Sequence, residues 1–145
     1  MLYYSVSSFG KNTSAIALAS NPTLGPKDST FKWTDEGIVI RSERTNNFNT
    51  IDPAVSFDAN GRLWLAFGSY WSGIKLVELD PKSGKRIGAD SPMHSLAWND
   101  NIEAAFIHRR GTNYVLFVNW GQCCKGTNST YEIRVGRSDH ITVTL

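Results

Sequence analysis

The chain has 145 residues, a formal net charge of +2 and 41% hydrophobic residues, which suits one domain with a substantial core and excludes intrinsic disorder. Its basic residues are scattered, which excludes the basic stripe of a nucleic-acid-binding protein. No apolar run approaches the ~20 residues that span a bilayer, and the first residues lack the basic and apolar regions of a signal peptide.

The first half of the chain predicts short strands separated by turns. Strands are expected at residues 2–7, 14–20, 37–41, 51–58, 62–69 and 74–80. The dipeptide Asn60-Gly61 is a strong hairpin signal between two of them. A short further strand is expected at 85–87, and residues 89–99 are expected to form a loop.

The second half restarts the same pattern, with strands expected at residues 102–109, 113–119, 131–137 and 140–145. Asp52 aligns with Glu103 and Trp64 aligns with Val115, and both offsets are 51 residues (103 − 52 and 115 − 64). Short strands in groups of about four, repeating every ~40–50 residues, are typical of β-propeller blades. A β-sandwich is the alternative, but the repeat favours the propeller.

The expected blade units are residues 2–41, 51–88 and 101–145. The first unit shows no inner strand, so the chain amounts to about two and a half blades, whereas a closed propeller needs at least four. An unclosed propeller exposes sheet edges and apolar faces. We therefore expect either a piece of a longer chain or copies that associate to close the ring.

Two carboxylates occupy the same setting at the start of expected inner strands. Asp52 stands between Ile51 and Pro53, and Glu103 stands between Ile102 and Ala104. Inner strands line the axis of a propeller, so the two acids are expected to converge, and paired carboxylates are what glycosidic hydrolysis requires. The alternative is that Asp52 only caps a turn and that Glu103 is a solvated strand end.

Cysteine and histidine give no metal site. Cys123 and Cys124 are adjacent, and two buried thiols are favoured over a strained disulfide between neighbours. His94, His108 and His140 do not cluster and are expected at the surface or in loops. No metal is assigned.

Several long motifs in the chain resemble glycoside hydrolase family 43, most closely its endo-1,5-α-L-arabinanases. The motifs are residues 3–10, 49–55, 61–74, 102–104 and 128–138. The resemblance implies a five-bladed β-propeller that hydrolyses glycosidic bonds with inversion by means of three acids. The resemblance makes Glu103 the general acid. It makes Asp52 the second acid, which raises the pKa of Glu103 and orients the Glu103 side chain.

The resemblance also places Asn49 and Ile51 on the substrate side of the site. Trp71 and Trp120 follow second strands, where an indole can stack on the apolar face of a sugar, and Trp71 is the preferred contact. Trp64 and Trp98 are expected to pack between blades.

The chain departs from the family at several points. The general base of the family lies in the first blade, upstream of these residues. The family's central His, which is associated with a calcium or other ion, lies in a last blade beyond Leu145, so no cofactor is expected within this chain. Ala105 and Phe106 replace the usual Pro and Tyr.

The expected function is endo-hydrolysis of 1,5-α-L-arabinofuranosidic linkages in extracellular arabinan, by a chain that is inactive alone because it lacks the base. The alternatives are a non-catalytic propeller piece that binds arabinan or its oligosaccharides, and another activity of the family (α-L-arabinofuranosidase or β-xylosidase).

Overall fold

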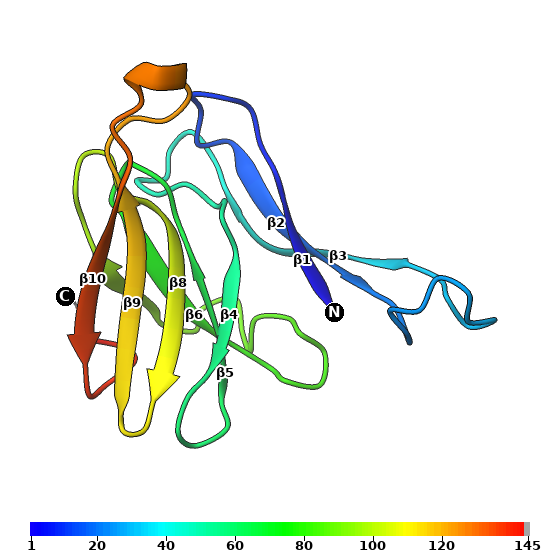
Figure 1. The fold of residues 1–145 in the computed structure, drawn as a ribbon. Helices are drawn as coiled ribbons and strands as arrows, with labels where there is room; N and C mark the ends of the chain where they lie inside the picture. Colours follow the sequence, from blue (N-terminus) through cyan, green and yellow to red (C-terminus); the bar gives the residue numbers. More distant parts are fainter. Residues whose placement is uncertain (144–145) are drawn as a thin grey trace.

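The computed structural model describes residues 1–143, which form three antiparallel sheets arranged in chain order (Figure 1). The first sheet contains β1 (Leu2–Val6), β2 (Ser14–Ser20) and β3 (Thr34–Ser42). The second contains β4 (Ala54–Phe57), β5 (Leu63–Phe67), β6 (Ile74–Leu79) and β7 (Met93–Ala97). The third contains β8 (Glu103–Arg110), β9 (Asn113–Trp120) and β10 (Glu132–Ser138).

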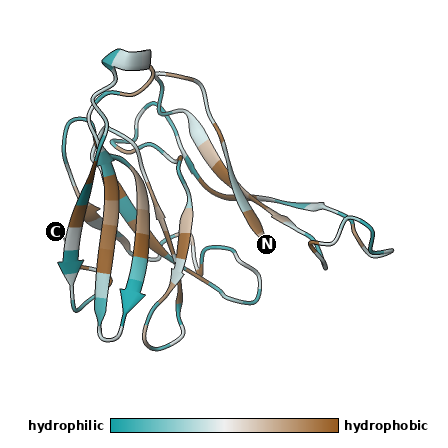
Figure 2. Cartoon of the chain, in the orientation of Figure 1, coloured by the Kyte–Doolittle hydropathy of each residue, from teal (hydrophilic) through white to brown (hydrophobic). Residues whose placement is uncertain are grey.

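The second sheet is apolar on both faces because a neighbouring sheet covers each face. Side chains of a strand alternate between its two faces, so alternate residues of β5 belong to different cores. Leu65 and Phe67 pack with Ile16 of the first sheet, whereas Trp64 and Ala66 pack in a separate cluster with the third sheet. Figure 2 shows the apolar middle of these strands and the polar turns at their ends.

This succession of stacked sheets is a partial β-propeller, and the predicted all-β propeller fold is confirmed. A two-sheet sandwich is excluded because the second sheet has a core on each side. Within the described residues the first and third sheets have three strands each, so only the second sheet shows the expected four.

The fourth strand of the second sheet lies where a loop was predicted. It is β7, which pairs with β6, whereas residues 85–87 contribute only an isolated bridge between Leu79 and Arg86. The sheet therefore runs past residue 88. β7 was missed because it is an outer strand in which only Leu96 is fully buried, so it lacks an apolar run.

The end of the chain also departs from prediction. A last strand was expected at 140–145, but residues 140–143 form a turn and a bend, and residues 144–145 lie outside the described part. Gly126–Asn128 forms a short 3₁₀ helix before β10. No helix in residues 1–143 is long and apolar enough to cross a membrane.

The sheets correspond to one another strand by strand, which determines where the loops meet. β4 and β8 each open a sheet, so the connection β5–β6 corresponds to β9–β10. β3 is the last strand of the first sheet, as β7 is the last strand of the second. Counting back from these strands, β1 corresponds to β5 and β2 to β6, so the β1–β2 connection is equivalent to β5–β6. All three connections contribute to one cavity, together with the segments that enter β4 and β8.

Candidate active site

A cavity of about 720 Å³ lies where the three sheets meet. Four of the five predicted site residues line it: Asn49, Ile51, Trp71 and Glu103. Asp52, the fifth, does not line it but is hydrogen-bonded to the residue after Glu103. The remaining lining residues are Ser7, Ser8, Phe9, Gly10, Lys11, Ser69, Tyr70, Asp100 and Cys123.

Asp52 joins the first, second and third sheets. Its backbone is left-handed, with φ of 58°, which is uncommon outside glycine, and its N–H donates to Ser5 Oγ over 3.2 Å. Its Oδ2 accepts a hydrogen bond of 3.2 Å from the N–H of Ala104. The carboxylate therefore bonds to the start of β8, in the next sheet, rather than to its own turn.

Glu103 is the first residue of β8 and is half-buried. Its Oε2 accepts a hydrogen bond of 2.8 Å from Ser69 Oγ, and Ser69 also forms an isolated β-bridge with Glu103. This bridge connects the end of β5 to the next sheet. The carboxyl group of Glu103 is thus held by the same residue that joins the two sheets.

Both carboxyl groups hold their protons more tightly than usual. Burial raises the pKa of Glu103, the hydrogen bond from Ser69 lowers it in part, and the negative charge of Asp52 raises it further. Burial also raises the pKa of Asp52, and the hydrogen bond from Ala104 opposes this effect. Both shifts favour the protonated forms of these carboxyl groups.

The two acids are not at identical positions of their sheets. In the segments that enter β4 and β8, Asp52 and Ala104 have left-handed backbones, and they are 52 residues apart (104 − 52), whereas the sequence repeat was 51. A register shift between Glu103 and Phe106 accommodates the extra residue. Glu103 therefore precedes the position that corresponds to Asp52, which places the two side chains at different distances from the cavity.

Aromatic side chains form part of the rim. Phe9, in the β1–β2 connection, is 92% exposed, and Trp71, in the β5–β6 connection, is 40% exposed. Tyr70 and Trp71 both have left-handed backbones, with φ of 55° and 41°. Such conformations persist only where the surroundings impose them, and they are common at functional sites.

Hydrogen bonds hold the β5–β6 connection in this conformation. The N–H of Tyr70 donates to the carbonyl of Ile102 over 2.8 Å, and Trp98 Nε1 donates to the carbonyl of Trp71 over 3.0 Å. The buried Lys75 donates from Nζ to the carbonyl of Ser72 over 2.8 Å, and burial lowers its pKa. Trp71 is therefore fixed against the entrance to β8.

Asn49 lines the cavity and is buried. Its Oδ1 accepts a hydrogen bond of 2.7 Å from Ser14 Oγ, which lies 2.7 Å from Ser7 Oγ. This chain of polar groups links the first sheet to the segment that carries Asp52. Asn49 thereby fixes the position of that segment while it lines the cavity.

Other residues depart from prediction. Cys123 and Cys124 form a disulfide and Cys124 is exposed, so the expectation of two buried thiols is wrong.

Trp120 packs against the core between the second and third sheets, away from the cavity. Trp64 is buried in that core as expected, whereas Trp98 is 63% exposed and does not pack between sheets.

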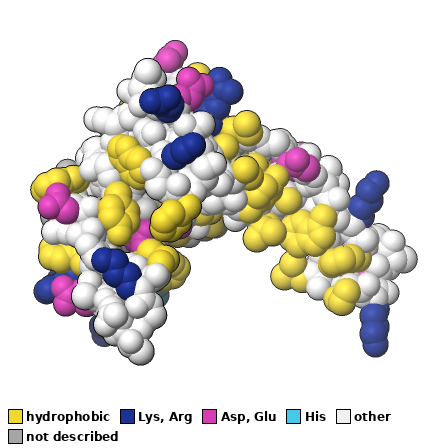
Figure 3. Space-filling model, turned by 90° about the horizontal axis from the view of Figure 1, so that it is seen from above, with side chains coloured by type: hydrophobic (Ala, Val, Ile, Leu, Met, Phe, Trp, Pro, Cys, Tyr) yellow, Lys and Arg dark blue, Asp and Glu magenta, His cyan; other side chains and the backbone are white. Residues whose placement is uncertain are grey.

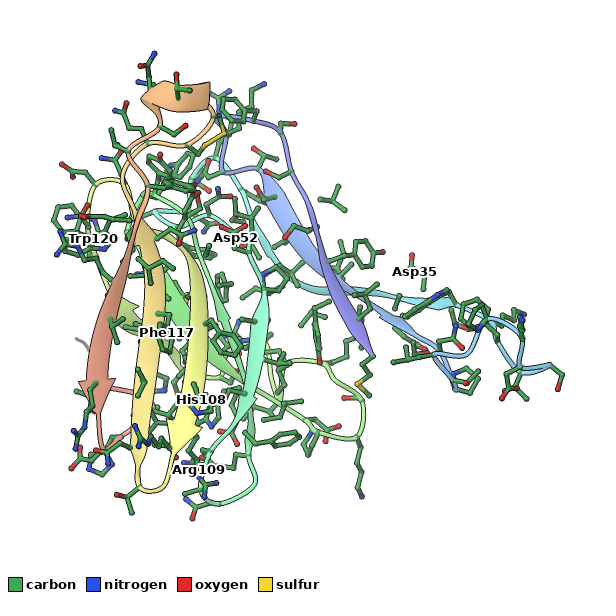
Figure 4. The ribbon with its side chains drawn as sticks, in the orientation of Figure 1. Asp35, Asp52, His108, Arg109, Phe117 and Trp120 are labelled. Atoms are coloured by element: carbon green, nitrogen blue, oxygen red, sulfur yellow. A yellow bond between two sulfur atoms is a disulfide. The ribbon has the colours of Figure 1, made fainter. Side chains whose placement is uncertain are left out.

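The histidines lie apart from the acids. Figure 4 shows Asp52 near the start of β8 and His108 toward the opposite end of that strand. His94 lies in β7 rather than in a loop and packs edge-on against Trp64. Among residues 1–143, no group of three or more His, Cys, Asp or Glu side chains could hold a metal ion.

Sequence reasoning missed nine cavity residues: Ser7, Ser8, Phe9, Gly10, Lys11, Ser69, Tyr70, Asp100 and Cys123. All of them except Asp100 have a recognisable signal, because they lie in the connections that follow equivalent strands of the three sheets. Asp100 carries no such signal, because it lies in the segment between β7 and β8.

The partial propeller places Glu103 on an aromatic-rimmed cavity, with Asp52 hydrogen-bonded to the next residue, and paired carboxyl groups are the arrangement that glycosidic hydrolysis uses. Comparison with known proteins identifies the class more narrowly. Residues 1–144 match the model of Glycosyl hydrolases family 43, and the chain belongs to that family.

Curated relatives include an extracellular endo-α-(1→5)-L-arabinanase of Bacillus subtilis, which is 50% identical over 97% of this chain and 43% of that protein. An extracellular exo-α-(1→5)-L-arabinofuranosidase of Cellvibrio japonicus is 43% identical over 97% of this chain and 44% of that protein. This chain thus spans less than half the length of either relative.

Solved structures include the α-L-arabinanase of Cellvibrio cellulosa in complex with arabinohexaose. It superposes with a TM-score of 0.90 at 41% identity, over 97% of this chain and 49% of that one. An exo-1,5-α-L-arabinanase from a bovine ruminal metagenomic library gives the same TM-score at 47% identity, over 97% of this chain and 48% of that one. The partial propeller thus corresponds to about half of an arabinanase fold.

Proposed function

We propose that this chain carries the proton-donating side of an extracellular, inverting arabinan hydrolase that cleaves 1,5-α-L-arabinofuranosidic linkages within the polysaccharide. The observation that carries the proposal is the hydrogen-bonded connection between Asp52 and the residue after Glu103 at the edge of a cavity with aromatic walls. Extracellular relatives that act on this polymer support the choice of substrate and location.

In this proposal Glu103 is the general acid. Burial raises its pKa and so favours its protonated form, which can deliver a proton to the glycosidic oxygen as the bond to the sugar breaks. Ser69 fixes the orientation of its carboxyl group. Asp52 adds negative charge beside Glu103 and holds the backbone of Ala104, so it tunes and orients the acid.

Substrate contacts come from the walls of the cavity. The indole of Trp71 presents an apolar face on which a sugar ring stacks, and Ile51 and Asn49 lie on the neighbouring wall. Inversion requires a base that takes a proton from the attacking water, and we assign none of the described residues to that role. Asp100 is the other carboxylate at the cavity, but it is exposed and belongs to the segment that enters β8.

Calorimetric titration of the 145-residue chain with arabinohexaose tests binding, and a separate titration with xylohexaose gives the comparison. We expect arabinohexaose to bind and Trp71→Ala to weaken binding by roughly fivefold, since loss of an aromatic stacking contact costs about 1 kcal/mol. Trp33→Ala is the matched control, because Trp33 is 42% exposed and lies outside the cavity. Stronger binding of xylohexaose would instead favour a xylosidase.

A second measurement separates binding from turnover. We expect the isolated chain to release negligible arabino-oligosaccharide, because none of its described residues is assigned as the base. Clear release that is lost in Glu103→Gln would contradict this expectation, and additional loss in Asp100→Asn would identify Asp100 as the source of the base. Binding without turnover is also what a non-catalytic arabinan-binding piece would give.

A further inference from the structure

We propose that the disulfide between Cys123 and Cys124 is a sugar-contact group on the rim of the cleft. It occupies the place that aromatic side chains hold in the other two sheets. The inference rests on the proposed function, because it concerns the same cleft and the same arabino-oligosaccharide ligand. It adds a binding group of a different chemical kind.

The equivalence of the three sheets carries the argument. Each sheet sends the connection after corresponding strands to the cavity: β1–β2, β5–β6 and β9–β10. The first supplies Phe9, the second supplies Trp71 and the third supplies Cys123. The third connection contributes no aromatic side chain to the cavity lining, since Trp120 packs into the core.

The β9–β10 connection is held rigidly enough to present such a group. The N–H of Thr130 donates to the carbonyl of Gln122 over 3.0 Å, and the N–H of Gln122 donates back to Thr130 Oγ1 over 3.0 Å. Gly121 allows this closure, because at its φ of 97° a Cβ would lie 2.2 Å from the carbonyl oxygen of Thr130. The loop is therefore closed at its base.

The backbone of the disulfide itself is similarly constrained. Cys124 has a left-handed backbone, with φ of 66°. Closer to the tip of the loop, the N–H of Lys125 donates to Ser129 Oγ over 3.1 Å. Cys123 reaches the cavity while Cys124 is exposed, so the disulfide faces both the cleft and the solvent.

The chemistry of this group suits a sugar. A disulfide between neighbours forms a small ring with two polarisable sulfur atoms and two methylene groups, without charge and without a strong hydrogen-bond donor. Such a surface complements the C–H face of a furanose ring, as an indole does. Reduction by a phosphine in water converts the disulfide to two thiols and the phosphine to its oxide, and removes the ring.

The experiment compares oxidised and reduced forms of the 145-residue chain by titration with arabinohexaose. We expect reduction with a phosphine to raise Kd by roughly three- to tenfold, and reoxidation to restore it. The variant Cys123→Ala/Cys124→Ala should bind as weakly as the reduced chain and should not respond to the phosphine. Circular dichroism at each step verifies that the sheets persist.

A second readout distinguishes contact from a purely structural role. Saturating arabinohexaose should slow reduction of the disulfide by the phosphine, measured by thiol titration, because the bound sugar covers the sulfur atoms. Xylohexaose at the same concentration is the control. Unchanged Kd together with an unchanged reduction rate would overturn the inference and leave the proposed function intact.

Two other outcomes are equally decisive. Free thiols in the chain purified without reductant would overturn the inference whatever the affinity for sugar. Absence of arabinohexaose binding to the oxidised wild-type chain would overturn the proposed function, and the inference would fall with it.

Discussion

Asp58 shows how much one side chain contributes to the second sheet. It begins the turn that closes the β4–β5 hairpin and is 2% exposed. Its two carboxylate oxygens accept hydrogen bonds from the N–H groups of Asn60 and Arg62, from Arg62 Nε and from Trp64 Nε1. Trp64 belongs to the core shared with the third sheet, so this turn is tied directly to the packing between sheets.

We predict that Asp58→Ala lowers the free energy of unfolding by about 2–4 kcal/mol, because it leaves the indole N–H of Trp64 buried without a partner and opens the turn. Urea denaturation measures the change. Asp80→Ala is the matched control: Asp80 also accepts hydrogen bonds within a turn, but they are exposed to solvent. Equal losses in the two variants would contradict the prediction.

Glu103 gives a pH-dependent prediction at the same scale. Its pKa in the folded chain is raised, so folding favours its protonated form; the associated stability is present below the unfolded pKa and is lost as pH rises through the folded value. We therefore predict that Glu103→Gln raises the melting temperature at pH 7 and that the difference disappears below about pH 4. A lower melting temperature of Glu103→Gln at pH 7 would contradict it.

At the scale of elements, the β5–β6 connection depends on Gly73. This glycine has φ of 76°, and a Cβ there would lie 2.2 Å from the carbonyl oxygen of Ala97, at the end of β7. Close approach of β7 to this loop also permits the hydrogen bond from Trp98 to Trp71. Gly73 therefore determines both the packing of the outer strand and the position of the rim tryptophan.

We predict that Gly73→Ala destabilises the chain by at least about 2 kcal/mol more than Gly37→Ala, as measured by thermal or urea unfolding. Gly37 has the same φ of 76° but nothing within 4 Å of its added Cβ, so its substitution costs only the left-handed backbone, roughly 1–2 kcal/mol. Similar losses for both glycines would show that the contact with Ala97 relaxes at little cost.

Most elements followed from local chemistry, and the failures have a common cause. The hairpin at Asn60-Gly61 and the buried strand β2 are visible because turn residues flank apolar runs. β7 is not visible, because it is an edge strand whose partner supplies its order. The aligned acids led to the cavity, but the register shift after Glu103 is an irregularity of the β8–β9 pairing that the 51-residue repeat does not show.

At the scale of the molecule, apolar faces remain uncovered. On the third sheet Val135 and Phe106 both stand opposite Phe117, forming an apolar row across the three strands. Val135 is 59% exposed, and its neighbour Ile133 is 70% exposed. Seen from above, the molecule is an arch with apolar side chains on both arms (Figure 3). Surfaces of this kind usually mark interfaces.

We predict that the isolated chain associates with itself and that Ile133→Lys/Val135→Lys suppresses this association. Light scattering over a range of concentrations measures it, with Lys27→Glu/Lys32→Glu as a control for altered charge elsewhere. Each copy has three sheets within residues 1–143, so two copies supply six sheets. Two and a half blades per copy would instead give five. A monomer at all concentrations would contradict the prediction.

The arch also has a mechanical consequence. The loops that carry Phe9, Trp71 and Cys123 come from three separate sheets, so the width of the cleft depends on the angles between sheets as well as on side-chain rotamers. An oligosaccharide that touches both arms would act as a tie between them and limit their bending. Part of its binding free energy would be spent on stiffening the arch, so an unclosed propeller should bind more weakly than a closed ring with the same contacts.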